Sequence, residues 1–400
     1  MTAKPDPFYP WFEGPLAQYL MRFSADEKAK YREAGDLLRL IPVTWPIGAN
    51  VINDADHFSG NTVTRVGDTL LVWFVTRAFH FGGTAKRSLD SWAGFTRSTD
   101  GGQTWSPVRR IDHELGVSET RIDGLGWGGF NTTLGDDTYI VCPRGIYHSG
   151  DEGVTWRVVP NNLGDLTPVG TWNHEPCYHP DKGLLILGNM GNDRIGLQNN
   201  IAVKYSKDLE HWDEEVYDLP ETMVPAEPTA VYHDGTLVFA TRNGSNGAGW
   251  PYAQMFSTRG WFPMEHYGET DITQTHVTAD NTSLIFNPIS GRYECIAGNR
   301  NGGGHGPEDP PCISVNLFSI APQDLLSGST HWRFEGTLLK RQGRFGEIDG
   351  HYPAGICIDL ERKVQYICVW MGVPSDQSAV FLIERTLDTP ALSAYLAPRS

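Results

Sequence analysis

Hydrophobic positions along this 400-residue chain gather into short runs that come in pairs, and turn-forming residues separate the members of each pair. Short apolar and β-branched runs on either side of Gly, Asp or Pro predict antiparallel hairpins. Six such pairs follow one another from Asp56 onward, each with a further outer pair, which predicts six units of four strands. The predicted first pairs are Asn61–Arg65 with Thr69–Thr76, Asn131–Leu134 with Thr138–Pro143, Glu175–His179 with Leu184–Asn189, Pro228–His233 with Thr236–Thr241, Ser283–Asn287 with Tyr293–Gly298, and Ala354–Asp359 with Val364–Met371.

The N-terminal part of the chain has a different pattern. Residues 1–24 are aromatic and rich in Pro, which indicates an irregular arm. The segment Ser24-Ala-Asp-Glu27 has the order of a capping box and predicts a helix over residues 25–38. The apolar run Leu37–Val43 then predicts a strand, which we expect to be the outer strand that closes the last unit.

An eight-residue pattern, S-x-D-x-G-x-T-W, occurs twice at an interval of 51 residues, as Ser98–Trp105 and Ser149–Trp156. An incomplete third copy, Ser206–Trp212, follows the second by 57 residues. Asp and Ser side chains bind nearby backbone amides, Gly adopts a positive φ, and Trp packs against the sheet. The pattern therefore predicts a hairpin turn that joins two outer strands. Self-similarity at about 40–50 residues is typical of β-propeller blades.

The repeated pattern resembles the Asp-box of the sialidase-like β-propellers, and the resemblance extends over about residues 50–395. It implies an all-β fold, a six-bladed β-propeller of four-stranded antiparallel blades, preceded by a short N-terminal helix. A count of seven blades stays open because residues 1–50 could contribute one. We expect residues 1–48 to form an arm with the helix at 25–38, and residues 49–400 to form a single catalytic propeller domain.

Charge and composition limit the classes of binding partner and the cellular compartment that we expect. The formal net charge of −16 argues against nucleic acid or an anionic membrane surface as a partner. No apolar run approaches a membrane span and the N-terminus has no hydrophobic leader segment, which favours a cytoplasmic setting; a leader removed before Met1 would indicate secretion. The six cysteines lack C-x-x-C spacing and are expected to be reduced and buried, although a bridge between Cys357 and Cys368 on one predicted hairpin stays open.

Groups at the mouth of a propeller come from the start of each innermost strand and the end of the following strand. Aligning the six units at these positions brings an Arg to the same place in four of them. Guanidinium groups bind carboxylates in bidentate fashion, so this set predicts a sialate, a uronate or a sulfated sugar as substrate. In the alternative interpretation each Arg pairs with a loop carboxylate of the next blade. The residues at the strand starts are His57, Asn131, His174, Glu175, Glu227, Asn281, His351 and Tyr352, and those at the strand ends are Arg77, Arg144, Arg242 and Arg300.

The fourth unit has the most specific site pattern. Glu227 precedes Arg242 by 15 residues, and the segment resembles the sialidase segment that contains a glutamate and an arginine of the carboxylate-binding triad. The resemblance implies that Arg242 binds the substrate carboxylate and that Glu227 polarises a tyrosine nucleophile, for which Tyr352 is the candidate. A carboxylate beside a phenol can accept its proton and generate a phenolate nucleophile. Arg300 lies about where the third arginine of the triad falls.

The first unit departs from the sialidase pattern. The run Asp56–Asn61 contains neither the Arg nor the Pro of the Arg-Ile-Pro motif, so the chain is not a typical sialidase. His57 stands at this place instead, and His351 is at the corresponding place in the last unit. Because histidine titrates near neutral pH, these side chains can supply acid and base groups. Propeller polysaccharide lyases use His or Tyr together with Arg, so β-elimination involving His57 and Tyr352 is a second hypothesis.

The sequence therefore leaves three hypotheses for the function. The first is an exo-acting glycoside hydrolase that cleaves an acidic glycan, with Tyr352 activated by Glu227. The second is a lyase that cleaves uronate-containing glycans, and the third is a sugar-binding propeller without catalysis. The expected partner in each case is an acidic oligosaccharide or glycoside, with neither nucleic acid nor membrane. Metal-ligand and nucleotide-binding motifs are absent from the sequence, so we expect no cofactor and no metal.

Overall fold

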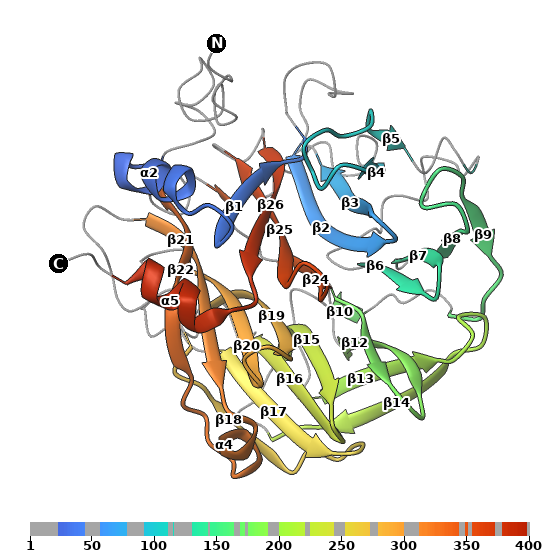
Figure 1. The fold of residues 1–400 in the computed structure, drawn as a ribbon. Coiled ribbons are helices and arrows are strands. Elements are labelled where there is room, and N and C mark those ends of the chain that lie inside the picture. The colour runs from blue at the N-terminus through green and yellow to red at the C-terminus, as the bar shows by residue number, and fades with distance from the viewer. Residues whose placement is uncertain are drawn as a thin grey trace.

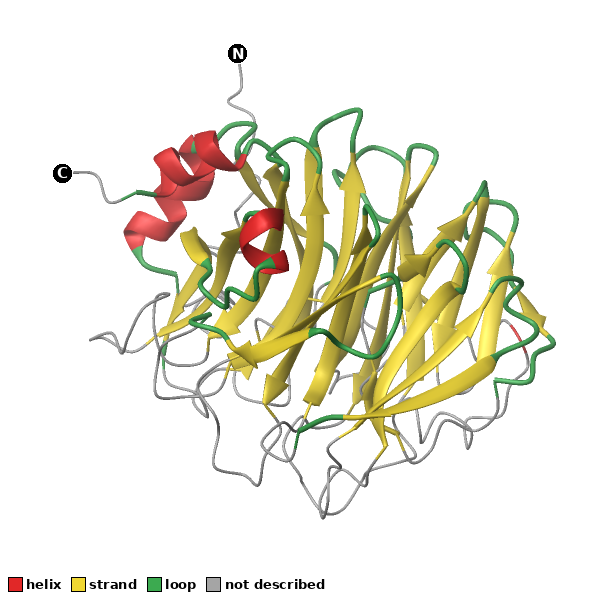
Figure 2. Ribbon diagram, turned by 90° about the horizontal axis from the view of Figure 1, so that it is seen from below, coloured by secondary structure: helices red, strands yellow, loops and turns green. Residues whose placement is uncertain are grey.

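Strands of the chain form six antiparallel sheets arranged as blades around a central axis (Figure 1). The computed structural model describes residues 23–44, 57–77, 92–110, 115, 130–142, 145–163, 169–172, 175–190, 200–220, 225–243, 253–272, 279–299, 312–343, 349–350, 354–372 and 378–397. At several strand ends within these ranges only the backbone is described. The strands of all six blades run up and down along the same axis (Figure 2). The predicted six-bladed β-propeller is confirmed.

Each blade is a meander in which the first strand lies next to the axis. Blades three and six have a split inner strand, as both segments pair with the same second strand. The six predicted first pairs are all present, so the turn residues between the hydrophobic runs marked the hairpins correctly. The strands are β2 (His57–Val66), β3 (Thr69–Arg77), β4 (Trp92–Ser98) and β5 (Arg109–Arg110) in blade one; β6 (Phe130–Leu134), β7 (Asp137–Cys142), β8 (Gly145–Ser149) and β9 (Arg157–Val159) in blade two; β10 (Val169–Trp172), β11 (Cys177–His179), β12 (Gly183–Met190), β13 (Asn200–Ser206) and β14 (Asp213–Asp218) in blade three; β15 (Pro225–His233), β16 (Thr236–Asn243), β17 (Ala253–Arg259) and β18 (His266–Glu269) in blade four; β19 (Ala279–Asn287), β20 (Arg292–Asn299), β21 (Cys312–Ile320) and β22 (Arg333–Gln342) in blade five; and β23 (Asp349–Gly350), β24 (Ala354–Asp359), β25 (Val364–Gly372) and β26 (Ser378–Thr386) in blade six.

The first strand of the chain completes the last blade. β1 (Leu38–Pro42) pairs antiparallel with β26 along its whole length, from Leu38 opposite Arg385 to Pro42 opposite Phe381. Beyond the strand, the amides of Val43 and Thr44 donate to the carbonyl of Val380. The expectation that this run is the outer closing strand is confirmed. Since β1 belongs to blade six, the described residues form six blades and not seven.

Three described helices lie outside the blades: α2 (Ala25–Glu33), α4 (Pro322–Leu326) and α5 (Thr389–Leu396). The capping prediction is confirmed, because the Ser24 hydroxyl accepts a hydrogen bond from the Glu27 amide over 3.1 Å. The predicted end at residue 38 is wrong. Gly35 follows the helix with a φ of +59°, a conformation that ends helices, and this frees the following residues to form β1. α2 and α5 are joined by a hydrogen bond of 2.7 Å from the Tyr395 hydroxyl to the Lys30 carbonyl.

The hydrophobic core lies between neighbouring blades and not in one central mass. Its largest cluster joins side chains of blades six, one and two, with Trp73 and Phe95 about 1% exposed. Four of the described cysteines, Cys177, Cys295, Cys357 and Cys368, belong to such clusters between blades. Five cysteines, Cys177, Cys295, Cys312, Cys357 and Cys368, are buried and unbridged. The pair left open, Cys357 and Cys368, is therefore reduced; these residues are on adjacent strands but face Tyr366 and Ala354, not each other.

The two full copies of the repeated pattern form the same turn between the third and fourth strands of blades one and two. In each, the Ser hydroxyl accepts from the Gly amide at 2.8 Å, as Ser98 from Gly102 and Ser149 from Gly153. The Asp carboxylate accepts from the amide and the hydroxyl of the Thr four residues later. Trp105 and Trp156 pack against the cluster between blades. The predicted hairpin turn between two outer strands is thus confirmed by these hydrogen bonds.

The incomplete third copy makes a related turn between β13 and β14. The Ser206 hydroxyl again accepts a backbone amide, from Leu209 at 2.8 Å, and Asp208 accepts the amides of Glu210 and His211. Leu209 has a φ of +66°. A leucine therefore adopts here the left-handed conformation that Gly adopts in the full copies, which is uncommon for a branched side chain.

Gly153→Ala is expected to destabilise the protein by about 3 kcal/mol, because it adds strain and a clash. Gly153 has a φ of +80°, and a Cβ atom there would lie 2.4 Å from Cδ1 of Leu71 in the preceding blade. The matched control is Gly235→Ala, at a φ of +75° with open space around the new atom, which should cost only about 1 kcal/mol. Urea denaturation of both variants tests this, and equal losses would contradict it.

Acid is expected to destabilise the hairpin turns formed by the two full copies of the repeated pattern. The Thr104 side chain and amide lower the pKa of Asp100 to about 2. Burial raises the pKa of Asp151, but hydrogen bonds from Thr155 and Ser149 outweigh it and lower that pKa to about 2. Because both folded pKa values lie below the usual value for Asp, the stabilisation is complete above about pH 4 and is lost as the pH falls toward about 2.

The measurement is the melting temperature between pH 5 and pH 2 for wild type, Asp151→Asn and Asp136→Asn. Asp151→Asn should melt at a lower temperature at pH 5 and lose less on acidification than wild type. Asp136 lies exposed in the turn between β6 and β7, so its variant serves as the control and should follow wild type. An Asp151→Asn curve parallel to wild type would show that the turn does not contribute to acid unfolding.

Candidate functional site

The antiparallel pairing of the first two strands of a blade brings the start of one and the end of the other to the same end of the molecule. In blade one, His57 and Arg77 are direct partners. In blade four, Ala226 is the partner of Arg242, and Glu227 follows it along β15. We call this end of the channel the mouth. The backbone therefore brings together these two of the pairs of positions that the alignment of the six units singled out.

The inner strands have an irregular register near the mouth, which the sequence analysis did not predict. Two residues oppose one between Ser59 and Thr62, and again between Ala226 and Thr229. Shifts also occur between Val169 and Trp172 in β10, after Asp280 in β19 and after Ala354 in β24. Bulges of this kind redirect side chains and are over-represented beside active sites. The signal that could have located four of these five is a Gly or Pro inside a strand, at Gly60, Gly170, Pro228 and Gly355.

Asn131, a predicted substrate-binding residue, is buried between blades one and two. Its side-chain amide donates to the Leu71 carbonyl over 2.8 Å, and its backbone amide donates to the Thr62 hydroxyl over 2.9 Å. The Thr62 hydroxyl in turn donates to its side-chain oxygen. With 1% of its surface exposed, Asn131 holds two inner strands together. A contact between Asn131 and substrate stays a prediction.

Glu175, the second predicted binding residue with a described side chain, joins three blades across the channel. It lies between β10 and β11, where the inner strand of blade three is split, and is 3% exposed. One carboxylate oxygen accepts from the Thr229 hydroxyl over 2.5 Å, and the other accepts from the Ser283 hydroxyl. Thr229 belongs to blade four and Ser283 to blade five. Neither hydroxyl stands out in the sequence, because each belongs to a single small residue within a hydrophobic strand.

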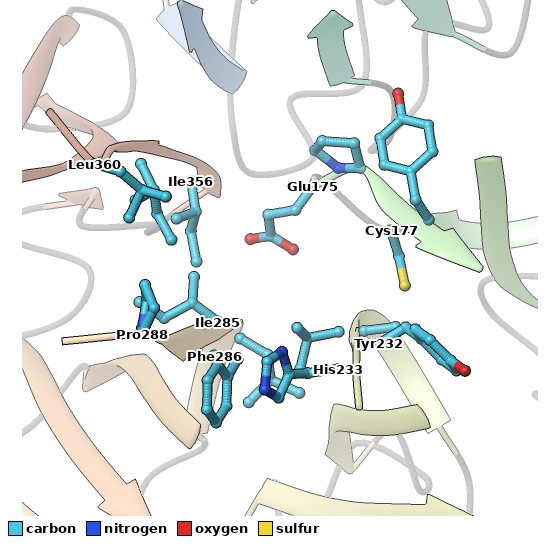
Figure 3. Close-up of a pocket in the computed structure, with 15 residues that line it drawn as sticks. Glu175, Cys177, Tyr232, His233, Ile285, Phe286, Pro288, Ile356 and Leu360 are labelled. Atoms are coloured by element: carbon cyan, nitrogen blue, oxygen red, sulfur yellow. The ribbon is translucent and has the colours of Figure 1, made fainter. Parts of the chain in front are cut away.

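A cavity of about 460 Å³ lies along the channel beside Glu175, and we call it the central cavity. Figure 3 shows the Glu175 carboxylate pointing into this space, with hydrophobic side chains from the inner strands around it. The wall comes from blades three, four, five and six. Its residues are Glu175, Pro176, Cys177, Tyr178, Ala230, Val231, Tyr232, His233, Leu284, Ile285, Phe286, Pro288, Ile356, Ile358 and Leu360.

The thiol in the cavity wall is not a nucleophile. Burial raises the pKa of Cys177 to about 12, and the negative charge of Glu175 adds to the effect. A thiol with such a pKa is protonated at neutral pH, whereas nucleophilic cysteines have lowered values. Burial likewise raises the pKa of Cys295. The cavity-lining Cys177 therefore lacks the lowered pKa of a nucleophilic cysteine.

The remaining predicted site residues are only partly covered by the described structure. For His57, Arg77, Glu227, Arg242 and Asn281 the backbone alone is described, and Arg144, His174, Arg300, His351 and Tyr352 lie outside the described residues. Within the described part of the chain, no group of three His, Cys, Asp or Glu side chains is arranged to hold a metal ion. The same part contains no helix long and apolar enough to cross a membrane.

Comparison with solved structures shows what the fold is similar to. The NanB sialidase of Streptococcus pneumoniae aligns with a TM-score of 0.57 at 11% identity, over 87% of this chain and 71% of that one. The Trypanosoma rangeli sialidase, in complex with sialic acid, aligns with a TM-score of 0.53 at 12% identity, over 88% of this chain and 58% of that one. No protein-family model and no curated protein matches the sequence. At this identity the likeness establishes a sialidase-like propeller fold.

Proposed function

We propose that the protein is a carbohydrate-active enzyme, an exo-acting glycoside hydrolase that cleaves an acidic glycan at the mouth of the propeller. The observation that supports this best is in blade four. Glu227 lies in the bulge of β15, directly after the partner of Arg242, in a fold like that of the sialidases. Fold alone does not determine function, so the proposal depends on these residues and not on the propeller as such.

In this proposal each mouth residue has a separate task. Glu227 accepts the proton of Tyr352, and the phenolate attacks the anomeric carbon as the glycosidic oxygen leaves. Arg77, Arg144, Arg242 and Arg300 hold the carboxylate of the sugar through paired hydrogen bonds. Water then displaces the tyrosine from the sugar, and Glu227 again takes part in proton transfer. The histidines that the sequence pattern assigns to the mouth, His57, His174 and His351, are the proposed candidates for the acid that protonates the leaving oxygen.

A second candidate is a lyase, and the observation that favours it is the first blade. His57, and not an arginine, pairs with Arg77 at the mouth end of β2 and β3. In β-elimination a base removes the proton beside the uronate carboxylate, Arg neutralises that carboxylate, and an acid protonates the departing oxygen. His57 and Tyr352 can supply the base and the acid.

The deciding experiment incubates the protein with sialosides and uronate-containing oligosaccharides and follows two signals together. One is the release of reducing ends, and the other is the ultraviolet absorbance of a new double bond conjugated to a carboxylate. New ends without absorbance support hydrolysis. New ends with equal absorbance identify a lyase and overturn the hydrolase proposal. If binding by calorimetry occurs without either signal, the protein is a sugar-binding propeller.

A further inference from the structure

The residue that follows the inner-strand bulge is anchored in the same way in blades one and four. Thr62 is the first residue of β2 to resume the regular register after the bulge, and Thr229 is the first residue of β15 to do so. Both threonines are 0% exposed. The hydroxyl of each donates to a side-chain oxygen of a neighbouring blade and accepts a backbone amide of a neighbouring blade. An arrangement that recurs at the same register position in two blades is a feature of the inner strands and not of one loop.

The hydroxyl of Thr229 joins blade four to both of its neighbours. It donates its single proton to Glu175 of blade three over 2.5 Å, and it accepts the backbone amide of Leu284, in blade five, over 3.2 Å. Glu175 also accepts from Ser283 of blade five, so the partner of Thr229 is itself held from a second side. Because these hydrogen bonds are buried, removing the hydroxyl leaves polar groups without compensation by water.

Thr229 is the nearest anchoring point for the proposed base. The two residues of the bulge, Glu227 and Pro228, oppose the single residue Thr241 on β16. Proline has no amide hydrogen, so Pro228 cannot donate a hydrogen bond that would fix the bulge. The first residue after Glu227 with both an amide hydrogen and a hydroxyl is Thr229. The backbone of Glu227 is therefore fixed on this side of the bulge through Thr229.

We propose that Thr229 is a positioning residue for Glu227, with Glu175 and Leu284 as its partners. The inference rests on the proposed hydrolase function, in which Glu227 accepts the proton of Tyr352. A bulge that two neighbouring blades hold at its end keeps the base in one place relative to the tyrosine. Catalytic groups need this precision, because a misplacement of about 1 Å can lower a rate by about 10²-fold. This role of Glu175 does not require contact with the sugar.

Thr229→Val tests the proposal, because valine has nearly the shape of threonine but no hydroxyl. It is expected to lower kcat on the best acidic glycoside at least about tenfold and to leave KM nearly unchanged, as for a displaced base. Thr229→Ser retains the hydroxyl and should recover most of the lost kcat. A general loss of stability would produce neither this recovery nor this separation of kcat from KM. Unchanged kcat in a folded Thr229→Val protein would overturn the proposal.

Amide hydrogen exchange gives a second readout that needs no substrate. Exchange in a peptide covering residues 225–229 should become at least about tenfold faster in Thr229→Val and stay at the wild-type rate in Thr229→Ser. Unchanged exchange in Thr229→Val would refute the anchor, whatever the activity. If the wild type cleaves no substrate of the panel, the hydrolase function fails, and exchange alone then decides whether Thr229 holds the bulge.

Thr96→Val is the matched control. Thr96, on the third strand of blade one, is also 0% exposed, and its hydroxyl donates to the Ser106 carbonyl over 2.7 Å. The substitution removes the hydroxyl of an equally buried threonine, but kcat and the exchange of residues 225–229 should match wild type. Equal losses in both variants would show a general structural effect and refute the assignment. Should Thr229→Val fail to fold, Ser283→Ala removes the other hydroxyl on Glu175, and unchanged kcat in that variant would also overturn the proposal.

Discussion

Replacing Glu294 with glutamine is expected to destabilise the protein by about 3–5 kcal/mol, the usual cost of breaking a buried ion pair. Glu294 on β20 and Arg385 on β26 are both 0% exposed and form an ion pair between blades five and six. Glutamine has nearly the same shape but no charge, so Arg385 would be left as a buried cation without its counterion. The hydrogen bonds to Glu294 come from Asn287 at 2.9 Å, Ser290 at 3.0 Å and Thr389 at 2.6 Å.

The free energy of unfolding in urea measures this effect, and Glu214→Gln is the matched control. Glu214 pairs with Lys204 at 3.0 Å, but its side chain is 40% exposed, so its loss should cost less than about 1 kcal/mol. The double variant Glu294→Met/Arg385→Met removes both charges and should recover part of the lost stability. If Glu294→Gln and Glu214→Gln lower the free energy of unfolding by similar amounts, the buried ion pair contributes no more to stability than the exposed one.

Glu227→Gln is expected to lower kcat on an acidic glycoside by about 10²–10⁴, the usual contribution of a general base. Glutamine keeps the size of the side chain but cannot accept the proton of Tyr352, so the phenolate would not form. KM should change little if the neighbouring arginines bind the sugar. Steady-state kinetics on the best substrate of the panel gives both parameters.

The control for this prediction is Glu269→Gln, on the outermost strand of the same blade, where the side chain is exposed. It should match wild type in kcat and in KM. If Glu227→Gln retains most of its activity while replacing His57 with Gln abolishes it, the base is His57. That outcome favours elimination, and the absorbance of the product would then confirm the lyase.

Features of the fold that are local in sequence could be predicted from the sequence, and features that join distant segments could not. A hairpin such as His233–Thr236 is determined by a few turn residues, so each strand pair is visible in the chain. The hydroxyls that hold Glu175 are 54 and 108 residues away from it, and no local pattern marks such partners. The central cavity is missed for the same reason, as its wall combines ordinary core residues of four blades.

The same distinction between local and distant features applies to the candidate site. Pairing of strand starts with strand ends is a consequence of antiparallel geometry, so the alignment of His57 with Arg77 and of Glu227 near Arg242 followed from the strand pattern. Burial between blades depends on the neighbouring blade, which the pattern within one blade does not contain. The strand pattern thus places Asn131 at the mouth but does not show that its polar groups bind Thr62 and Leu71.

Pairing of β1 with β26 has a consequence for the order of events during synthesis. Arg39 and Glu384 form an ion pair across this junction, although they are 345 residues apart in the sequence. At a translation rate of about 5–20 residues per second, β1 leaves the ribosome roughly 20–70 s before its partner exists. Blades one to five can form hairpin by hairpin during that interval, but the ring closes only when the last strand arrives. A circular permutant that begins after β1 and carries residues 23–44 behind α5 would make the last blade continuous and remove the wait.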